Sequence, residues 1–246
     1  MTESCIVPEW NVPSNVRALV TTRYGGASGG VYAGLNLGDH VGDDPALVAQ
    51  NRAALRSMLP TEPVWLKQVH GVVVADADAV SGPVEADASV ARRPGTVCAV
   101  LTADCLPLLL CDDAGTVVAA AHAGWRGLAA GVIERTVRSM AVNPASIIAY
   151  LGPAIGPAAF EVGDEVRQTF IAADPAAQQA FTQHSALGAE KWLADIYLLA
   201  TQQLNRLGVE RIHGGGCCTH GDAQRFYSYR RDGATGRMAS LIWLDG

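Results

Sequence analysis

Lysine is almost absent from this sequence, and its basic residues nowhere form a run longer than a pair. Of 18 basic residues only Lys67 and Lys191 are lysines, and 24 acidic residues bring the formal net charge of the 246-residue chain to −6. A negative overall field repels nucleic acids and anionic membranes. We therefore expect no nucleic-acid partner, and an anionic ligand must be held by individual arginines, whose forked guanidinium suits oxyanions.

A long hydrophobic segment is also missing. No apolar run reaches the roughly 18 to 20 residues that span a bilayer, and residues 1–5 lack the basic start of a signal peptide. We expect a cytoplasmic protein with no membrane partner. At 49% hydrophobic and 17% charged residues the chain can bury a full core. No repeat or linker divides the chain, so a single domain over residues 1–246 is predicted. We expect the protein to be a monomer or a small homo-oligomer.

Strand-like and helix-like segments alternate along the chain, which predicts a mixed α/β architecture. The most apolar, β-rich runs cover residues 96–101, 106–111 and 116–121, and these are expected to be central strands buried on both faces. Further strands are predicted at residues 16–22, 64–67, 72–75, 147–151, 226–229 and 238–244. Helices are predicted at about residues 45–59, 127–140, 164–172 and 190–207.

Cysteine and histidine occur six times each. A chain of this length without a signal peptide favours reduced thiols over a disulfide framework. The twelve residues are Cys5, Cys98, Cys105, Cys111, Cys217, Cys218, His40, His70, His122, His184, His213 and His220. No two histidines form a His-x-His pair.

Three segments place reactive side chains beside glycines at the ends of predicted strands: residues 68–71, 102–105 and 121–127. Such turns are where α/β proteins usually hold ligands. His70, Cys105 and His122 together form a His₂Cys set, which holds Zn²⁺ and leaves a fourth tetrahedral position open. Their spacing is not that of a compact zinc finger, and each also admits a purely structural role.

Two neighbouring residues extend this picture. Arg126 stands where a strand turns through glycines into a helix, a plausible cradle for phosphate or carboxylate, although an ordinary strand-to-helix turn has the same pattern. Asp104 precedes Cys105 and would orient a histidine or act as a general base, unless it is only a turn residue.

Aromatic and basic residues meet near the C-terminus. Tyr229 and Arg230 follow Phe226 and Tyr227, a combination that suits stacking on a nucleotide-like ligand. For Phe226 and Tyr227 a half-buried edge strand is the preferred interpretation, and it is also open for Tyr229. The glycine-rich segment before them contains Cys217 and Cys218, which we interpret as packed or capping residues.

Taken in order, these motifs closely resemble the YfiH/YlmD family, also called laccase-domain or multicopper polyphenol oxidase proteins. The resemblance extends from about residue 21 to the C-terminus. It rests on TTRYGG (21–26), NLG (36–38), QVHG (68–71), TADCLP (102–107), AHAGWRG (121–127), GPAIG (152–156), FEVG (160–163) and SYRRDG (228–233). It implies an α/β/β/α sandwich like the catalytic domain of cytotoxic necrotising factor, and a metal held by His70, Cys105 and His122. It also implies purine nucleoside phosphorylase activity on adenosine, inosine and methylthioadenosine, with adenosine deamination alongside.

The family's older name can be tested on composition. A multicopper oxidase needs a trinuclear cluster with about eight imidazoles, usually supplied as His-x-His pairs. Six unpaired histidines do not provide it. Blue-copper laccase chemistry is therefore excluded, and only weak phenol oxidation by copper bound in the His₂Cys site remains open.

The resulting hypothesis is a zinc-dependent enzyme that takes a small nucleoside and phosphate, with copper as an alternative metal. Zinc would activate water or polarise the nucleoside, and His70, Cys105, His122 and Asp104 form the catalytic set. The substrate-binding residues expected are Arg23, Asn36, Gln68, Arg126 and Arg230. Two other classes stay open: a Cys/His amide hydrolase with Cys105 as nucleophile, editing UDP-sugar peptide precursors of peptidoglycan, and a non-catalytic metal or nucleotide binder.

Overall fold

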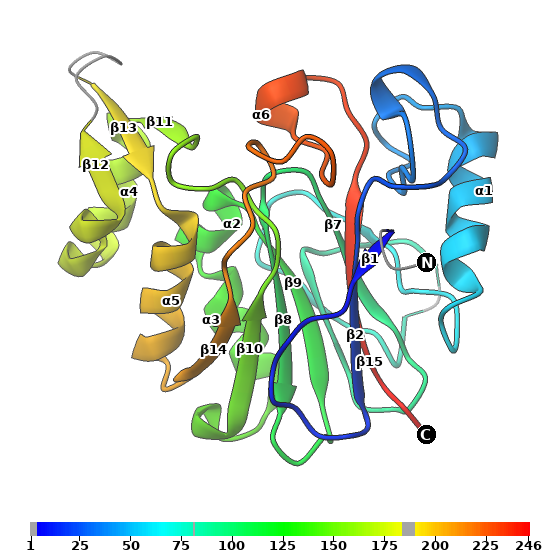
Figure 1. Ribbon diagram of the computed structural model, residues 1–246. Helices are drawn as coiled ribbons and strands as arrows, with labels where there is room; N and C mark the ends of the chain where they lie inside the picture. The colour runs from blue at the N-terminus through cyan, green and yellow to red at the C-terminus, as the bar shows by residue number, and fades with distance from the viewer. Residues whose placement is uncertain (1–3, 81, 184–189) are drawn as a thin grey trace.

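The computed structural model describes residues 4–80, 82–183 and 190–246. Two β-sheets lie at the centre (Figure 1). The four-stranded sheet has the order β1 (Cys5–Ile6), β2 (Val16–Thr21), β15 (Met238–Leu244) and β7 (Cys98–Thr102), all antiparallel. The six-stranded mixed sheet has the order β14 (Arg211–Gly214), β10 (Ile147–Leu151), β8 (Leu106–Asp112), β9 (Val118–Ala123), β6 (Ala88–Ala91) and β4 (Val74–Asp76).

The two sheets pack face to face because their strands carry apolar residues on both sides. Along β8, Leu109 and Cys111 belong to the cluster between the sheets, whereas Leu108 and Leu110 belong to the cluster beneath the helices. Every residue of β7, β8, β9 and β15 is buried. Each fully buried leucine contributes about 1.5–3 kcal/mol of hydrophobic free energy. The predicted central strands are thus confirmed as buried on both faces.

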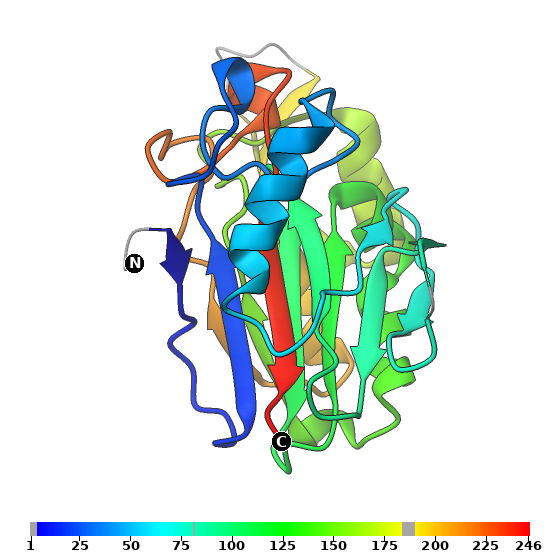
Figure 2. The same ribbon diagram turned by 90° about the vertical axis from the view of Figure 1, so that its right-hand side faces the viewer.

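Helices cover both outer faces (Figures 1 and 2). Helix α1 (Pro45–Arg56) begins at the cap Asp44, whose side chain accepts the N–H of Ala46, and packs Leu55 against the four-stranded sheet. Helices α2 (Trp125–Ala130), α3 (Val132–Met140) and α5 (Ile196–Arg206) cover the six-stranded sheet. The layers therefore follow the order α/β/β/α, which confirms the predicted mixed α/β sandwich.

Smaller elements surround this sandwich. A three-stranded sheet of β11 (Glu161–Gly163), β13 (Lys191–Ala194) and β12 (Phe181–Gln183) packs with α4 (Asp164–Ala173). Strands β3 (Leu66–Lys67) and β5 (Val84–Glu85) form a parallel pair, and α6 (Tyr229–Asp232) is a single turn. Short 3₁₀ helices cover Gly30–Tyr32, Pro144–Ser146 and Pro175–Ala180.

Three predicted segments are wrong in type or extent. The helix expected over 127–140 begins earlier, at Trp125, and is broken at Gly131, which adopts a φ of 95° and ends α2. The helix expected from residue 190 begins only at Ile196, capped by Asp195, because residues 191–194 pair as β13. Residues 226–229 do not form a strand: Phe226 and Tyr227 are fully buried, and Ser228 caps α6.

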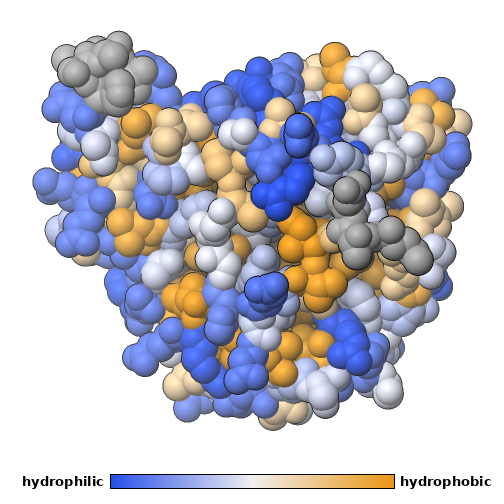
Figure 3. Space-filling model, viewed as in Figure 1, coloured by the Kyte–Doolittle hydropathy of each residue, from blue (hydrophilic) through white to orange (hydrophobic). Residues whose placement is uncertain are grey.

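No helix in the described part of the chain combines the length and apolar composition needed to cross a membrane. On the face shown in Figure 3, hydrophobic side chains form patches interrupted by polar ones.

Candidate active site and metal centre

Two neighbouring strands bring Cys105 and His122 together. In the β8–β9 hairpin Leu106 pairs with Ala123 and Pro107 pairs with His122, so Cys105, just before β8, lies beside the end of β9. Gly124 follows at that end, and a Cβ there would come within 2.8 Å of the Cys105 sulfur. The glycine is needed because this sulfur occupies the space that a side chain would fill.

Asp87 fixes the histidine side of the site. It precedes β6, where Ala88 pairs with Ala121, and its Oδ1 lies 2.8 Å from Nδ1 of His122. The same carboxylate accepts the N–H groups of Val69, His70 and Gly71 at 3.2, 2.9 and 2.6 Å. One buried acid therefore orients one ring and anchors the loop that carries the other.

His70 completes the set from that loop. Its φ of 60° is in the left-handed region, a conformation maintained by the Asp87 hydrogen bonds. The His70 and His122 rings meet edge to face with centroids 4.7 Å apart. The ligand atoms of His70, Cys105 and His122 all lie within 4.8 Å of one another, with 3.7 Å between the Cys105 sulfur and Nε2 of His70.

These donors fit a tetrahedral metal ion. Zinc bonds of about 2.3 Å to sulfur and about 2.0 Å to nitrogen place the two ligand atoms roughly 3.5 Å apart. The 3.7 Å between the Cys105 sulfur and Nε2 of His70 is close to that spacing, and all three ligand atoms lie within 4.8 Å of one another. His122 uses Nδ1 for Asp87, so its Nε2 remains for the metal, as metal-binding histidines usually arrange.

Without a metal, the thiol and the imidazole share one proton. Burial alone would raise the pKa of Cys105, but the charge of His122 and hydrogen bonds from both histidines lower it to about 6. Burial would lower the pKa of His122, but Cys105 and Asp87 raise it to about 9. At neutral pH the metal-free pair is therefore a thiolate beside an imidazolium, and the sulfur is already in the form that binds metals.

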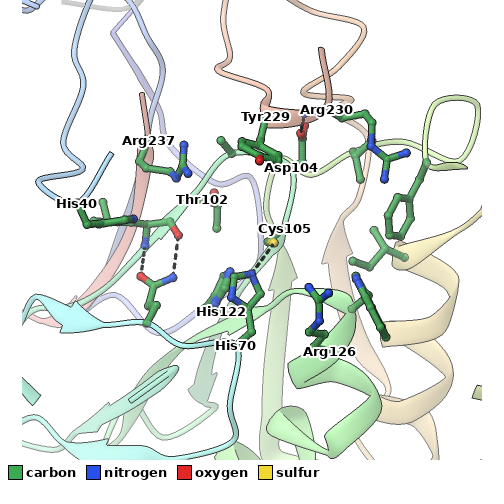
Figure 4. A pocket seen from close by; sticks show the side chains of 17 residues that line it. His40, His70, Thr102, Asp104, Cys105, His122, Arg126, Tyr229, Arg230 and Arg237 are labelled. Carbon is green, nitrogen blue, oxygen red and sulfur yellow. Dashed lines mark hydrogen bonds between the residues drawn. The ribbon is translucent and has the colours of Figure 1, made fainter. Parts of the chain in front are cut away.

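The set lies in a cavity of about 470 Å³ (Figure 4). Its walls combine apolar and aromatic side chains with cationic ones, as small-molecule pockets commonly do. The lining residues beside the metal set are His40, Gln68, Leu101, Thr102, Ala103, Asp104, Trp125, Arg126, Ile155, Phe160, Ile196, Tyr229, Arg230 and Arg237. A second hollow of about 750 Å³ adjoins it and shares His40 and Gln68.

Gln68 and Asp104 line the cavity but have their polar atoms engaged. The Gln68 amide exchanges two hydrogen bonds with the backbone of Leu101. Asp104, at a φ of 87°, accepts the hydroxyls of Thr219 and Ser228 and the N–H of Arg230. In this geometry Asp104 ties two C-terminal loops to the site.

The predicted arginines separate into two groups. Arg126 stacks over Trp125 and Arg230 over Phe160, and both line the cavity. Arg23 instead stacks on Tyr227 and donates to backbone carbonyls away from the lining.

Asn36 is not among the lining residues either. It is fully buried, and its amide bonds Gly38, Asp43 and the N–H of Arg237. The structure therefore does not bring Arg23 or Asn36 to the pocket.

Four site residues were missed by the sequence reasoning: Asp87, His40, Thr102 and Arg237. Asp87 had a usable signal, since an acid directly before a run of small and apolar residues (ASVA, 88–91) that reads as a buried strand is unusual. Arg237 had none, because the pairing of β15 with β7 that brings it to the site is a long-range contact.

Among residues 4–80, 82–183 and 190–246, no second group of three His, Cys, Asp or Glu side chains is placed to hold a metal. The six cysteines are free. The sulfur of Cys218 accepts the N–H groups of Gly156 and Gly221, a capping contact of the kind expected for it. His184 lies outside the described residues.

Comparisons with known proteins place this geometry in a family. Residues 17–245 match the family model described as "Multi-copper polyphenol oxidoreductase laccase". The chain is 56% identical to "Purine nucleoside phosphorylase YfiH" of Escherichia coli K12, over 97% of this chain and 98% of that protein. It is 54% identical to "Purine nucleoside phosphorylase PA4543" of Pseudomonas aeruginosa, with the same coverage.

A solved structure supports the same assignment. The crystal structure of Neisseria meningitidis protein NMB0706 superposes with a TM-score of 0.95 at 52% identity, covering 99% of this chain and 100% of that one. Sequence and structure agree over nearly the whole chain. The protein is therefore a member of the multi-copper polyphenol oxidoreductase laccase family.

Proposed function

We propose that this protein is a zinc-dependent purine nucleoside phosphorylase that acts on adenosine, inosine and methylthioadenosine, with adenosine deamination as a side activity. The observation that carries the proposal is a set of three side chains that could hold a metal ion, inside a cavity that arginines line. The cavity of about 470 Å³ has room for a nucleoside together with phosphate. The names of the relatives from Escherichia coli and Pseudomonas aeruginosa support the same activity.

His70, Cys105 and His122 would hold the ion, and Asp87 would position His122. When bound there, zinc supplies Lewis acidity toward an oxygen of the substrate or of water. Copper in the same donor set would allow at most weak oxidation of phenols.

In phosphorolysis a phosphate oxygen forms a bond to C1′ of the ribose while the bond from C1′ to purine N9 breaks. The purine leaves with the electron pair and takes a proton, so inosine and phosphate give hypoxanthine and ribose 1-phosphate. Arg126 and Arg230, at the mouth of the cavity, would attract the phosphate, and Tyr229, which is exposed there, would stack on the base. In deamination, adenosine and water give inosine and ammonia.

A second function is favoured by one specific relationship. Cys105, His122 and Asp87 form a thiol, imidazole and carboxylate chain like that of cysteine hydrolases. In the metal-free protein the Cys105 thiolate would attack an amide carbonyl, such as the L-Ser amide of a UDP-sugar peptide, forming a thioester as the C–N bond breaks and His122 protonates the departing amine. Water would then cleave the thioester, releasing the carboxylic acid and restoring Cys105. Zinc on Cys105 would occupy this nucleophile, so the two functions exclude each other at one site.

One experiment separates them. The purified protein is analysed for zinc, and adenosine, inosine and the UDP-sugar peptide are each incubated with and without phosphate and followed by mass spectrometry. We expect stoichiometric zinc, hypoxanthine only when phosphate is present, and loss of that product in Cys105→Ala. Hypoxanthine release unchanged by Cys105→Ala would refute the phosphorylase proposal, and peptide cleavage by metal-free protein alone would establish the hydrolase.

A further inference from the structure

Arg237 lies on a wall of the cavity that none of the predicted arginines reaches. It directly precedes β15, where Met238 pairs with Thr102 at the end of β7, so Arg237 and Thr102 come from adjacent strand ends. Nη1 of Arg237 donates to the carbonyls of Thr235 and Gly236 at 2.9 and 3.0 Å. The half-buried guanidinium is thus fixed in position, and Figure 4 shows it well away from Arg126.

Among the described residues Arg237 forms no direct ion pair, although Cys105 and Asp104 lie close enough to act on its charge. Within the described part of the chain no carboxylate pairs with it, and its Nε and Nη2 atoms donate to no protein group. The nearby carboxylate of Asp104 is engaged by Thr219 and Ser228. Partly enclosing a cation without a direct ion-pair partner costs free energy, and an anionic ligand would lower that cost.

Thr102 is an independent sign of a ligand at the same place. The residue is only 2% exposed and lines the cavity, yet its hydroxyl has no hydrogen-bond partner among the described residues. The hydroxyl oxygen is not one of the enclosed polar atoms that lack a partner, so it is accessible from the cavity and can donate to a ligand there. A fixed guanidinium and an unpaired hydroxyl therefore lie on neighbouring strand ends. Together they can donate hydrogen bonds to a ligand with several acceptor oxygens.

The two rim arginines are less suited to hold such a group. Arg126 is exposed, stacks only on Trp125, and makes no hydrogen bond to the described residues, so solvent screens it and ordering it costs entropy. The guanidinium of Arg230 already donates to the carbonyl of Glu161. A pre-organised, partly enclosed donor binds an anion more tightly than a mobile exposed one.

We infer that Arg237 and Thr102 form the seat for inorganic phosphate, with Arg126 and Arg230 acting only in its capture at the rim. The inference rests on the proposed phosphorolysis for its biological meaning, but the anion site itself is defined by these two residues. In this site Nε and Nη2 of Arg237, its two free donors, would bind two phosphate oxygens, as guanidinium groups bind oxyanions. The Thr102 hydroxyl would donate a third hydrogen bond.

The test measures binding and catalysis separately. Isothermal titration with inorganic phosphate, without nucleoside, is run on the zinc-loaded wild type and on Arg237→Met, Thr102→Val and Arg126→Gln. Arg138→Gln, which removes a surface charge paired with Glu134, is the matched control. We expect phosphate affinity to fall at least tenfold in Arg237→Met and about threefold in Thr102→Val. Arg126→Gln should lose less than threefold, and the control should bind like the wild type.

Steady-state kinetics with inosine give the second readout. Arg237→Met and Thr102→Val should raise KM for phosphate in parallel with the binding loss, while KM for inosine stays within twofold. Thermal unfolding identifies any variant that misfolds. If Arg237→Met misfolds, the isosteric change Thr102→Val still decides the test. Wild-type phosphate affinity in Thr102→Val and a folded Arg237→Met would overturn the inference. If no variant, including the wild type, phosphorolyses inosine but phosphate binding depends on Arg237, the proposed function fails and the anion site stands.

Discussion

The carboxylate of Asp87 lies 2.8 Å from Nδ1 of His122 and at the same time accepts three N–H groups from the loop that carries His70. Two of the three metal donors are thus oriented by one buried side chain. Burial alone would raise the pKa of Asp87, but these hydrogen bonds lower it, so the carboxylate is ionised when it supports the site.

Replacing Asp87 with Asn should weaken zinc binding about 10- to 100-fold, because outer carboxylates fix the tautomer and basicity of the histidine ligand. In this variant an amide NH₂ would also face backbone N–H groups that donate to a carboxylate oxygen in the wild type. Competition with a chelator measures the affinity. Glu134→Gln on the surface of α3 is the control, and equal zinc affinity in Asp87→Asn and wild type would contradict the role assigned here.

Alkylation of the metal-free protein should show a reactive thiolate at unusually low pH. The pKa of Cys105 is lowered to about 6, so the thiol is protonated and slow below that pH, and the thiolate reacts fully from roughly one unit above it. A free cysteine, with a pKa of about 8.5, is mostly thiolate only above that pH. Iodoacetamide labelling rates from pH 4 to 9, located by peptide mass spectrometry, check this.

Two buried cysteines serve as internal controls for that labelling. Burial raises the pKa of Cys98 and of Cys111 to about 12, so neither should react in the folded protein. His122→Ala should move the Cys105 midpoint upward, because the imidazolium that stabilises the thiolate is removed. A midpoint near 8.5 in the wild type would show that the ion pair does not form.

Gly124→Ala should abolish metal binding while leaving the fold intact. Gly124 has a φ of −60° and a ψ of 155°, which alanine adopts freely, so the backbone is not strained. The added Cβ would lie 2.8 Å from the Cys105 sulfur and 3.0 Å from the His70 ring, displacing both donors. Zinc content should fall more than tenfold.

Gly29→Ala is the matched control, because nothing lies within 4 Å of its Cβ and its φ is −122°. Both variants should keep the wild-type circular dichroism spectrum. Full zinc occupancy in Gly124→Ala would mean that the sulfur has room that the structure does not show.

Asp104→Asn should loosen the C-terminal wall of the cavity. Asp104 accepts from Thr219, Ser228 and the N–H of Arg230, and an amide satisfies these donors less well, which costs about 1–3 kcal/mol of unfolding free energy. Urea denaturation measures that loss. KM for inosine should rise more than kcat falls, whereas a general base at this position would instead lose kcat by two orders of magnitude or more.

Local patterns predicted the sandwich well because its strands are long apolar runs and its first helix has a clear Asp-Pro start. They also predicted the metal set, since His70, Cys105 and His122 each stand at a strand end or in a glycine loop. They failed at Lys191–Ala194, where pairing with β11 and β12 outweighs helical propensity, and at Phe226 and Tyr227, which are buried without being in a strand. Arg237 was out of reach for the same reason: its neighbour Thr102 is far away in the sequence and adjacent only through the β7–β15 register.

The β8–β9 hairpin, whose residues are all buried, has a consequence for motion as well as for position. Amides in such central strands exchange with deuterium only on global unfolding, whereas those of exposed loops exchange by local opening. Cys105 and His122 are therefore attached to the slowest-exchanging part of the molecule, while Tyr229 and Arg230 belong to a single exposed turn. Hydrogen exchange should separate a slowly exchanging half of the cavity, which carries the candidate metal ligands Cys105 and His122, from a faster-exchanging half that carries Tyr229 and Arg230.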